Sequence, residues 1–179
     1  MKIICLFIYK RILGWHFSNS APKDLKKYII IAAPHTSWLD FPLGVLTKFA
    51  LGIPANYIGK DSLFKPPFGF IFKLLGGTPV DRTKSHNLVD QIVDLFNKKD
   101  AFILALSPEG TRKKTEKWKT GFYYIAKGAK VPIVMIALDF EHKTVKFSEP
   151  YFTTDNIEAD FNHFYDFYRG VKGKHPELF

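Results

Sequence analysis

The segment His35-Thr-Ser-Trp-Leu-Asp40 places an imidazole and a carboxylate close together, directly after the apolar run of residues 28–33. A histidine can take a proton from an attacking hydroxyl, and a carboxylate can orient that histidine. Five residues at helical pitch turn through about 140°, so the two side chains cannot share one face of a regular helix. They can meet if His35 lies in the turn after a strand and Asp40 lies in the first turn of the following helix.

The same segment allows a purely structural interpretation. Ser37-x-x-Asp40 resembles a capping box with Asp in the place of the usual Glu. In that case His35 is an ordinary loop residue. Taken alone, the segment leaves the catalytic pair and the helix cap both open.

Two further polar segments follow apolar runs. Residues 76–82, Gly-Gly-Thr-Pro-Val-Asp-Arg, end in Arg82, whose planar guanidinium suits a phosphate group. Residues 107–112, Ser-Pro-Glu-Gly-Thr-Arg, predict a tight turn that presents Glu109 and Arg112. Glu109 can accept from a hydroxyl or pair with an arginine. Taken singly, each segment is more often a solvated surface loop.

The elements that must position these residues are strands alternating with helices. The predicted strands span residues 28–33, 55–59, 78–80, 101–107, 131–138 and 144–147, and the clearest helical periodicity covers residues 87–98 and 118–130. Several strands are apolar at successive positions, as expected when both faces are buried. The alternation predicts an α/β fold with a largely parallel central sheet flanked by helices.

The polar motifs share one position in this predicted fold. His35, Arg82 and Glu109 each follow the end of a predicted strand. In open α/β sheets, ligands bind in the crevice beyond the carboxyl ends of the strands. We therefore expect the three corners to converge on one site.

Composition limits the classes of partner. Lysine and arginine number 26 against 17 acidic residues, a net charge of +9, and aromatic residues make up 16 % of the chain. This charge favours an anionic partner such as nucleic acid, acidic lipid or a phosphorylated substrate. The sequence carries no helix-turn-helix, zinc or aromatic-stacking motif of nucleic-acid binding. The single cysteine, Cys5, excludes an internal disulfide and a cysteine-based metal site.

The first 17 residues have their own pattern. Their opening apolar run is broken by Lys10 and Arg11 after seven residues, which is too short to span a bilayer. Apolar residues at helical spacing predict an amphipathic helix over residues 2–17. We expect residues 1–17 to be a membrane-association segment, with packing against the sheet as the alternative, and residues 18–179 to be one α/β domain. A second aromatic stripe at residues 161–168 is expected to pack against the sheet.

In this order the motifs resemble the glycerolipid acyltransferase family typified by bacterial lysophosphatidic acid acyltransferases of the PlsC type. The matching blocks are His35-x4-Asp40, the strand ending at Arg82, residues 108–112 and residues 131–134. The first and third blocks are the specific ones, and the resemblance covers roughly residues 28–140. The chain departs from the family at Pro34, commonly Asn, and at Ser107, commonly Phe. These positions bear on acceptor choice and local geometry.

The resemblance implies roles for the motif residues. His35 would be the general base and Asp40 the residue that orients it. The implied substrate-binding residues are Arg82, Glu109, Gly110, Thr111 and Arg112, with the two arginines on the acceptor phosphate. No metal and no cofactor is expected beyond an acyl-CoA or acyl-carrier-protein co-substrate. The acyl chain is expected along Phe64, Phe68, Phe70, Ile71 and Leu74, for which a plain core position is equally compatible.

The implied function is transfer of a fatty acyl group from a coenzyme A or acyl-carrier-protein thioester to a hydroxyl of a lysolipid. The expected acceptor is lysophosphatidic acid, as for a 1-acylglycerol-3-phosphate O-acyltransferase, and the product is phosphatidic acid. The expected location is the cytoplasmic side of the membrane, as a peripheral or monotopic protein, without nucleic acid. The alternatives are another acceptor such as a lyso-aminolipid, a lipid or thioester hydrolase, and a non-catalytic basic membrane- or nucleic-acid-binding domain.

Overall fold

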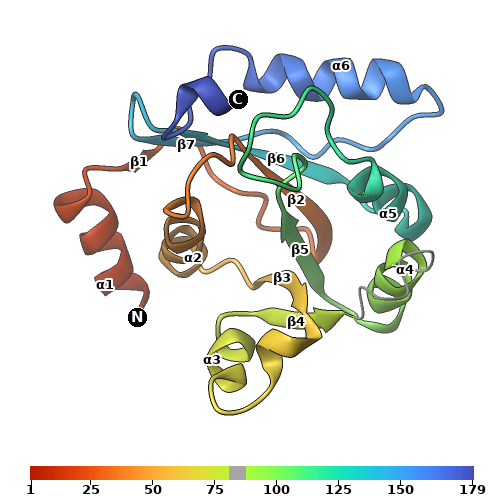
Figure 1. Ribbon diagram of the computed structural model, residues 1–179, viewed down its shortest axis with the longest axis horizontal. Coiled ribbons are helices and arrows are strands. Elements are labelled where there is room, and N and C mark those ends of the chain that lie inside the picture. The colour runs from red at the N-terminus through yellow and green to blue at the C-terminus, as the bar shows by residue number, and fades with distance from the viewer. Residues whose placement is uncertain (81–87) are drawn as a thin grey trace.

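A seven-stranded sheet with helices on both faces forms the centre of the molecule (Figure 1), in a computed structural model that describes residues 1–80 and 88–179. The strand order is β1-β7-β6-β2-β5-β3-β4, and β6–β7 is the one antiparallel pair in this order. The strands are β1 His16–Phe17, β2 Lys27–Ala33, β3 Ala55–Lys60, β4 Gly77–Val80, β5 Phe102–Leu106, β6 Ile133–Asp139 and β7 Thr144–Phe147. The predicted largely parallel sheet is therefore confirmed, with β1 as an unpredicted edge strand.

The helices follow the predicted alternation. They are α1 Lys2–Phe7, α2 Asp40–Leu51, α3 Gly69–Leu74, α4 Leu88–Lys98, α5 Gly121–Ala129 and α6 Ile157–Tyr168. A π-helical turn, Ile8–Ile12, continues α1, and short 3₁₀ turns occupy Asp61–Phe64 and Pro176–Leu178. No helix within residues 1–80 and 88–179 is long and apolar enough to span a membrane.

Strand β2 lies at the centre of the sheet because both of its faces are apolar. Ile29 and Ile31 belong to the buried cluster shared with α4, α5 and α6. Tyr28 and Ile30 belong to the cluster on the opposite face, which includes Leu43 of α2. The alternation of side chains along a strand thus fills two separate cores from one apolar run.

Strand β3 pairs with β5 over only its first two residues. It pairs with β5 at Ala55 and Asn56, and from Tyr57 onward it pairs with β4 instead. The sheet therefore opens beside the carboxyl end of β5. This opening lies next to the loop that follows β2.

The N-terminal helical region spans residues 2–12, shorter than the predicted 2–17. One side of it is core: Tyr9 is fully buried and stacks on Phe17 with ring centroids 4.5 Å apart, and Trp15 beyond it is also buried. The other side is exposed, with Ile3 at 82 % and Phe7 at 59 % of their maximal exposure. The segment has two apolar sides, and one of them faces outward.

Candidate active site

The loop after β2 and the first turn of α2 bring His35 and Asp40 together. His35 Nδ1 lies 3.0 Å from Asp40 Oδ2. Asp40 is the first residue of α2 and is buried, whereas the His35 side chain is 29 % exposed. The carboxylate accepts from Nδ1–H, so the other ring nitrogen, Nε2, is left with a lone pair for chemistry. This is the geometry of an oriented general base.

Asp40 also holds the turn in which His35 lies. The Ser37 N–H donates to the same Oδ2 at 2.9 Å, and the Leu39 N–H donates to Ser37 Oγ at 3.2 Å. The carboxylate thus holds the backbone of the turn and is the partner of the imidazole at once. Ser37 is not the N-cap of α2, because that position is Leu39, which makes no side-chain capping hydrogen bond. The second oxygen of Asp40, Oδ1, is buried and has no hydrogen-bond partner among the described residues.

Glu109 holds the loop that carries His35 through hydrogen bonds to its backbone and to Ser107. Its Oε1 accepts from the His35 N–H at 2.9 Å, and its Oε2 accepts from Ser107 Oγ at 2.7 Å. The side chain is 3 % exposed, and this burial raises the pKa of Glu109 although both hydrogen bonds favour the carboxylate. Glu109 is therefore placed to hold the backbone of His35, whereas the predicted role was contact with substrate.

The C-terminal region contacts both strand β2 and the loop that follows it. Tyr168 of α6 donates its hydroxyl to the Ile31 carbonyl at 2.6 Å, and the His175 N–H donates to Thr36 Oγ1 at 3.1 Å. Gly173 lies so close that an added Cβ would be 2.6 Å from Thr36 Oγ1. No sequence motif indicated these contacts.

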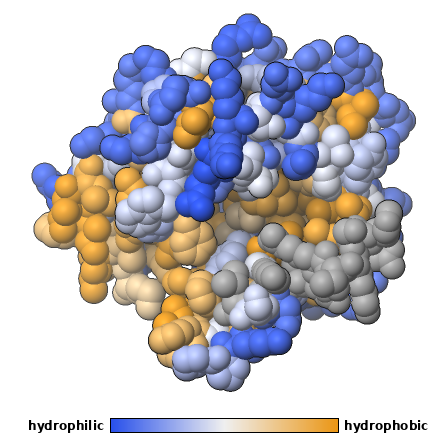
Figure 2. Space-filling view, viewed as in Figure 1, coloured by the Kyte–Doolittle hydropathy of each residue, from blue (hydrophilic) through white to orange (hydrophobic). Residues whose placement is uncertain are grey.

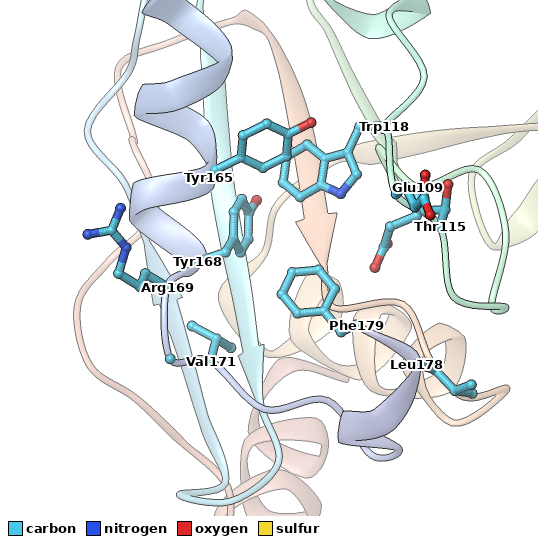
Figure 3. A pocket seen from close by; sticks show the side chains of 11 residues that line it. Glu109, Thr115, Trp118, Tyr165, Tyr168, Arg169, Val171, Leu178 and Phe179 are labelled. Carbon is cyan, nitrogen blue, oxygen red and sulfur yellow. The ribbon is translucent and has the colours of Figure 1, made fainter.

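A cavity of about 370 Å³ separates the C-terminal region from the Glu109 loop. Figure 3 shows Trp118 and Tyr165 at one side of it, with Tyr168 and Phe179 nearby and Glu109 on the adjoining loop. Trp118 lies against Tyr168 with ring centroids 5.4 Å apart. Glu109 contributes to this cavity and not to the larger one that contains His35.

The larger cavity, of about 1150 Å³, lies where β3 leaves β5 and is lined by both His35 and Asp40. Residues of α2 line it from one face of the sheet, and residues of α4 and α5 line it from the other. Its lining is mostly apolar and includes Val45, Ile53, Ile58, Val89, Ile92 and Leu106. A cavity of this size and lining suits a long hydrocarbon chain beside the His35–Asp40 pair.

Cationic side chains line one part of this cavity. Arg112, Lys113 and Lys119 come from the segment after β5, and all three are exposed. Lys48 of α2 also lines the cavity, donates to the Leu75 carbonyl at 2.9 Å, and has its pKa lowered by burial. The rim therefore offers positive charge for an anionic headgroup.

The remaining predicted substrate residues have mixed positions. Gly110 and Thr111 line the larger cavity, and Gly110 has φ +66°, a conformation that favours glycine. Arg82 lies outside the described residues. The structure thus brings together the first and third motifs, while the second motif is described only as far as the end of β4.

The predicted acyl-chain residues are not the ones that line the cavity. Phe64 is buried below α3, where its ring lies 6.3 Å from that of Phe72. The other four are exposed: Phe68 65 %, Phe70 67 %, Ile71 41 % and Leu74 77 %. A short helix on the sheet edge can bury one side only, and these side chains lie on the other. Leu75, the next residue, does line the cavity.

Comparison with known proteins relates this arrangement to acyl transfer. A family model described as acyltransferase matches residues 15–139. The crystal structure of the 1-acyl-sn-glycerophosphate (LPA) acyltransferase PlsC from Thermotoga maritima is similar in fold, with a TM-score of 0.67 and 20 % sequence identity over 94 % of this chain and 77 % of that chain. Comparison with curated protein sequences gives no significant match.

Proposed function

The chain belongs to the acyltransferase family, and from that premise we propose that it transfers a fatty acyl group from a coenzyme A or acyl-carrier-protein thioester to a lysolipid hydroxyl. The acceptor we propose is lysophosphatidic acid, which gives phosphatidic acid. One observation carries the proposal: the His35–Asp40 pair lines a largely apolar cavity that also has a cationic part. A catalytic base, space for an acyl chain and charge for a phosphate are then combined in one site.

The proposed step is direct transfer. His35 Nε2 takes the proton of the acceptor hydroxyl while the hydroxyl oxygen attacks the thioester carbonyl carbon. The new C–O ester bond forms, the C–S bond breaks, and the proton passes from the imidazolium to the departing thiolate. Asp40, 3.0 Å from Nδ1, stabilises the imidazolium between these two proton transfers. The step requires no covalent enzyme intermediate and no further cofactor.

Headgroup recognition is assigned to the cationic part of the cavity. Arg112 offers a planar fork of donors, and Lys113 and Lys119 add positive charge beside it. Arg112→Ala should raise the KM for lysophosphatidic acid more than it lowers kcat, because it removes binding that precedes the chemical step. Unchanged kinetics in this variant would favour a lysolipid without a phosphate, such as a lyso-aminolipid.

The direct experiment is acyl transfer with purified protein. A labelled acyl thioester is supplied with lysophosphatidic acid in detergent or vesicles, and phosphatidic acid is measured, with His35→Ala as the matched control. The proposal expects product from the wild-type chain and its loss in the variant. Release of free fatty acid that does not depend on added lysolipid would indicate a hydrolase. The absence of transfer to any lysolipid, where a known acyltransferase works, would refute the proposal.

We also propose that the protein works at a membrane surface, on the cytoplasmic side, with the exposed face of residues 1–13 in contact with lipid. Removal of the whole segment is a poor test, because Tyr9 and Trp15 belong to the core. Ile3→Ser combined with Phe7→Ser changes only exposed side chains. We expect this variant to shift from the pellet to the supernatant when it is sedimented with anionic vesicles.

A further inference from the structure

The described surface carries a second group of exposed apolar side chains, on and beside α3. Phe68, Phe70, Ile71 and Leu74 are each more than two-fifths exposed. They are not lining residues of the cavity at His35, and they do not belong to either buried core cluster. An exposed apolar patch of this kind indicates an interaction site.

The segment that carries these side chains is hydrogen-bonded to β3 and to α2. The Tyr57 hydroxyl donates to the Phe72 carbonyl at 3.2 Å, and Lys48 Nζ donates to the Leu75 carbonyl at 2.9 Å. Gly69 packs on the backbone of Phe64 so closely that an added Cβ would overlap the Phe64 carbonyl oxygen. The outward side chains are therefore presented on a braced turn.

The charge around this patch is mostly positive. Residues 61–80 contain Lys65 and Lys73, both exposed, and one acidic residue, Asp61, which is also exposed. Residues 1–23, which include the exposed face of α1, contain four Lys and Arg residues and no acidic one. Aromatic and aliphatic side chains flanked by lysines are typical of elements that enter the interface of an anionic bilayer.

The position of α3 relates this patch to the cavity. Leu75 lines the cavity, and the neighbouring Leu74 is 77 % exposed. Figure 2 shows hydrophobic colour over α1 at the left, over α3 below and in the hollow at the centre, while hydrophilic colour covers the region of α6 above. The α1 and α3 patches thus lie on the same side of the molecule as the hollow.

We propose that residues 65–74 form a second bilayer-inserting element, which acts with the exposed face of residues 1–13 to seat the cavity on an anionic lipid surface. The inference rests on the proposed function in one respect, namely that the substrates are lipids. It adds that lysolipid and acyl chain enter from the bilayer, between the two elements. Lys65 and Lys73 would lie at the level of the lipid phosphates, and the phenyl rings below them.

The first test is vesicle partition of a double variant, Phe70→Ser with Leu74→Ser, on vesicles of mixed phosphatidylglycerol and phosphatidylcholine. Insertion of one such side chain raises the partition coefficient between water and vesicles roughly tenfold, so loss of both should lower it about 10²-fold. Phe152→Ser with Tyr124→Ser is the matched control, because these side chains are 62 % and 51 % exposed on other elements. The control should bind like the wild-type chain. Unchanged partition of the α3 variant would overturn the proposal.

A second measurement does not depend on stability. Cys5 is buried, so a Cys5→Ala chain with Phe70→Cys carries one accessible thiol for an environment-sensitive fluorophore. The label at position 70 should brighten and shift to the blue on anionic vesicles, and a label placed by Phe152→Cys should not. A label at position 70 that stays in water on bound protein would refute insertion of α3. Neither measurement requires turnover, so an inactive enzyme that still inserts would refute only the proposed reaction.

Discussion

Asp40→Asn separates the charge of this side chain from its hydrogen bonds. The asparagine oxygen can replace Oδ2 and still accept from His35 Nδ1 and the Ser37 N–H, which lie 3.0 and 2.9 Å away. The amide NH₂ then occupies the place of Oδ1, which is buried without a partner among the described residues. The loop should keep its shape while the imidazolium loses its counter-charge.

The size of the effect follows from this geometry. Opposite charges about 4 Å apart attract by about 4 kcal/mol at an effective dielectric constant near 20. The His35 side chain is 29 % exposed, so water screens part of this attraction, and about 2–4 kcal/mol remains. If that stabilisation acts on the imidazolium of the transition state, kcat falls roughly 30- to 10³-fold. KM should change little, because substrate does not bind through Asp40.

The assay is acyl transfer to lysophosphatidic acid at saturating thioester, together with thermal unfolding of each variant. Asp139→Asn is a matched control: Asp139 Oδ2 lies 2.7 Å from His142 Nδ1, so the chain has a second aspartate–histidine contact that does not line the cavity. The control should keep its activity. An Asp40→Asn protein that is folded and has kcat within about threefold of wild type would refute the role of the carboxylate as counter-charge.

Three further variants test the site. His35→Ala should lower kcat by about 10²-fold or more with an unchanged circular dichroism spectrum, because it removes the general base. Glu109→Gln tests the burial of this carboxyl group, which raises the pKa of Glu109. As pH rises from near 4 through that raised pKa, the free energy of unfolding of the wild-type chain should fall relative to that of the Gln variant. Urea denaturation at several pH values measures this difference. Gly173→Ala should displace Thr36, 2.6 Å from the added Cβ, and lower kcat about tenfold in the transfer assay while the KM for thioester stays constant.

Much of the fold was predictable because the sheet is built from local patterns. The runs at residues 28–33 and 133–138 are apolar at successive positions, and they form β2 and β6 side by side in the sheet. The proximity of His35 and Asp40 was predictable for the same reason, since a strand end followed by a helix start restricts both side chains. The six predicted strands all form, with ends that differ by at most two residues.

What the sequence did not predict depends on contacts between distant segments. Tyr168 bonds to Ile31 across 137 residues, and His175 bonds to Thr36 across 139. Glu109 in a tight turn can face a substrate or the back of another loop, and its residue type is the same in both cases. Only the fold places it 2.9 Å from the His35 N–H.

Apolar residues gave a comparable difficulty at α3. Phe70 and Leu74 are as hydrophobic as Ile92 and Leu106, and sequence alone does not tell a cavity wall from an exposed surface. The position of β3 distinguishes the two. Because β3 leaves β5 after Asn56, the wall of the cavity comes from α2, α4 and α5, and α3 remains at the outer edge.

The two networks around His35 have different consequences for catalysis. Asp40 acts on the imidazole ring through Nδ1, whereas Glu109 accepts from the His35 N–H and the His175 N–H donates to the Thr36 hydroxyl of the same loop. Loss of the Asp40 charge should therefore destabilise the transition state in a loop that is still correctly placed. Loss of a contact that holds the loop should misplace a base that still has its counter-charge. Because these two defects combine within one loop, their effects on kcat should not be additive, and a double-mutant cycle of Asp40→Asn with Gly173→Ala would measure that coupling directly.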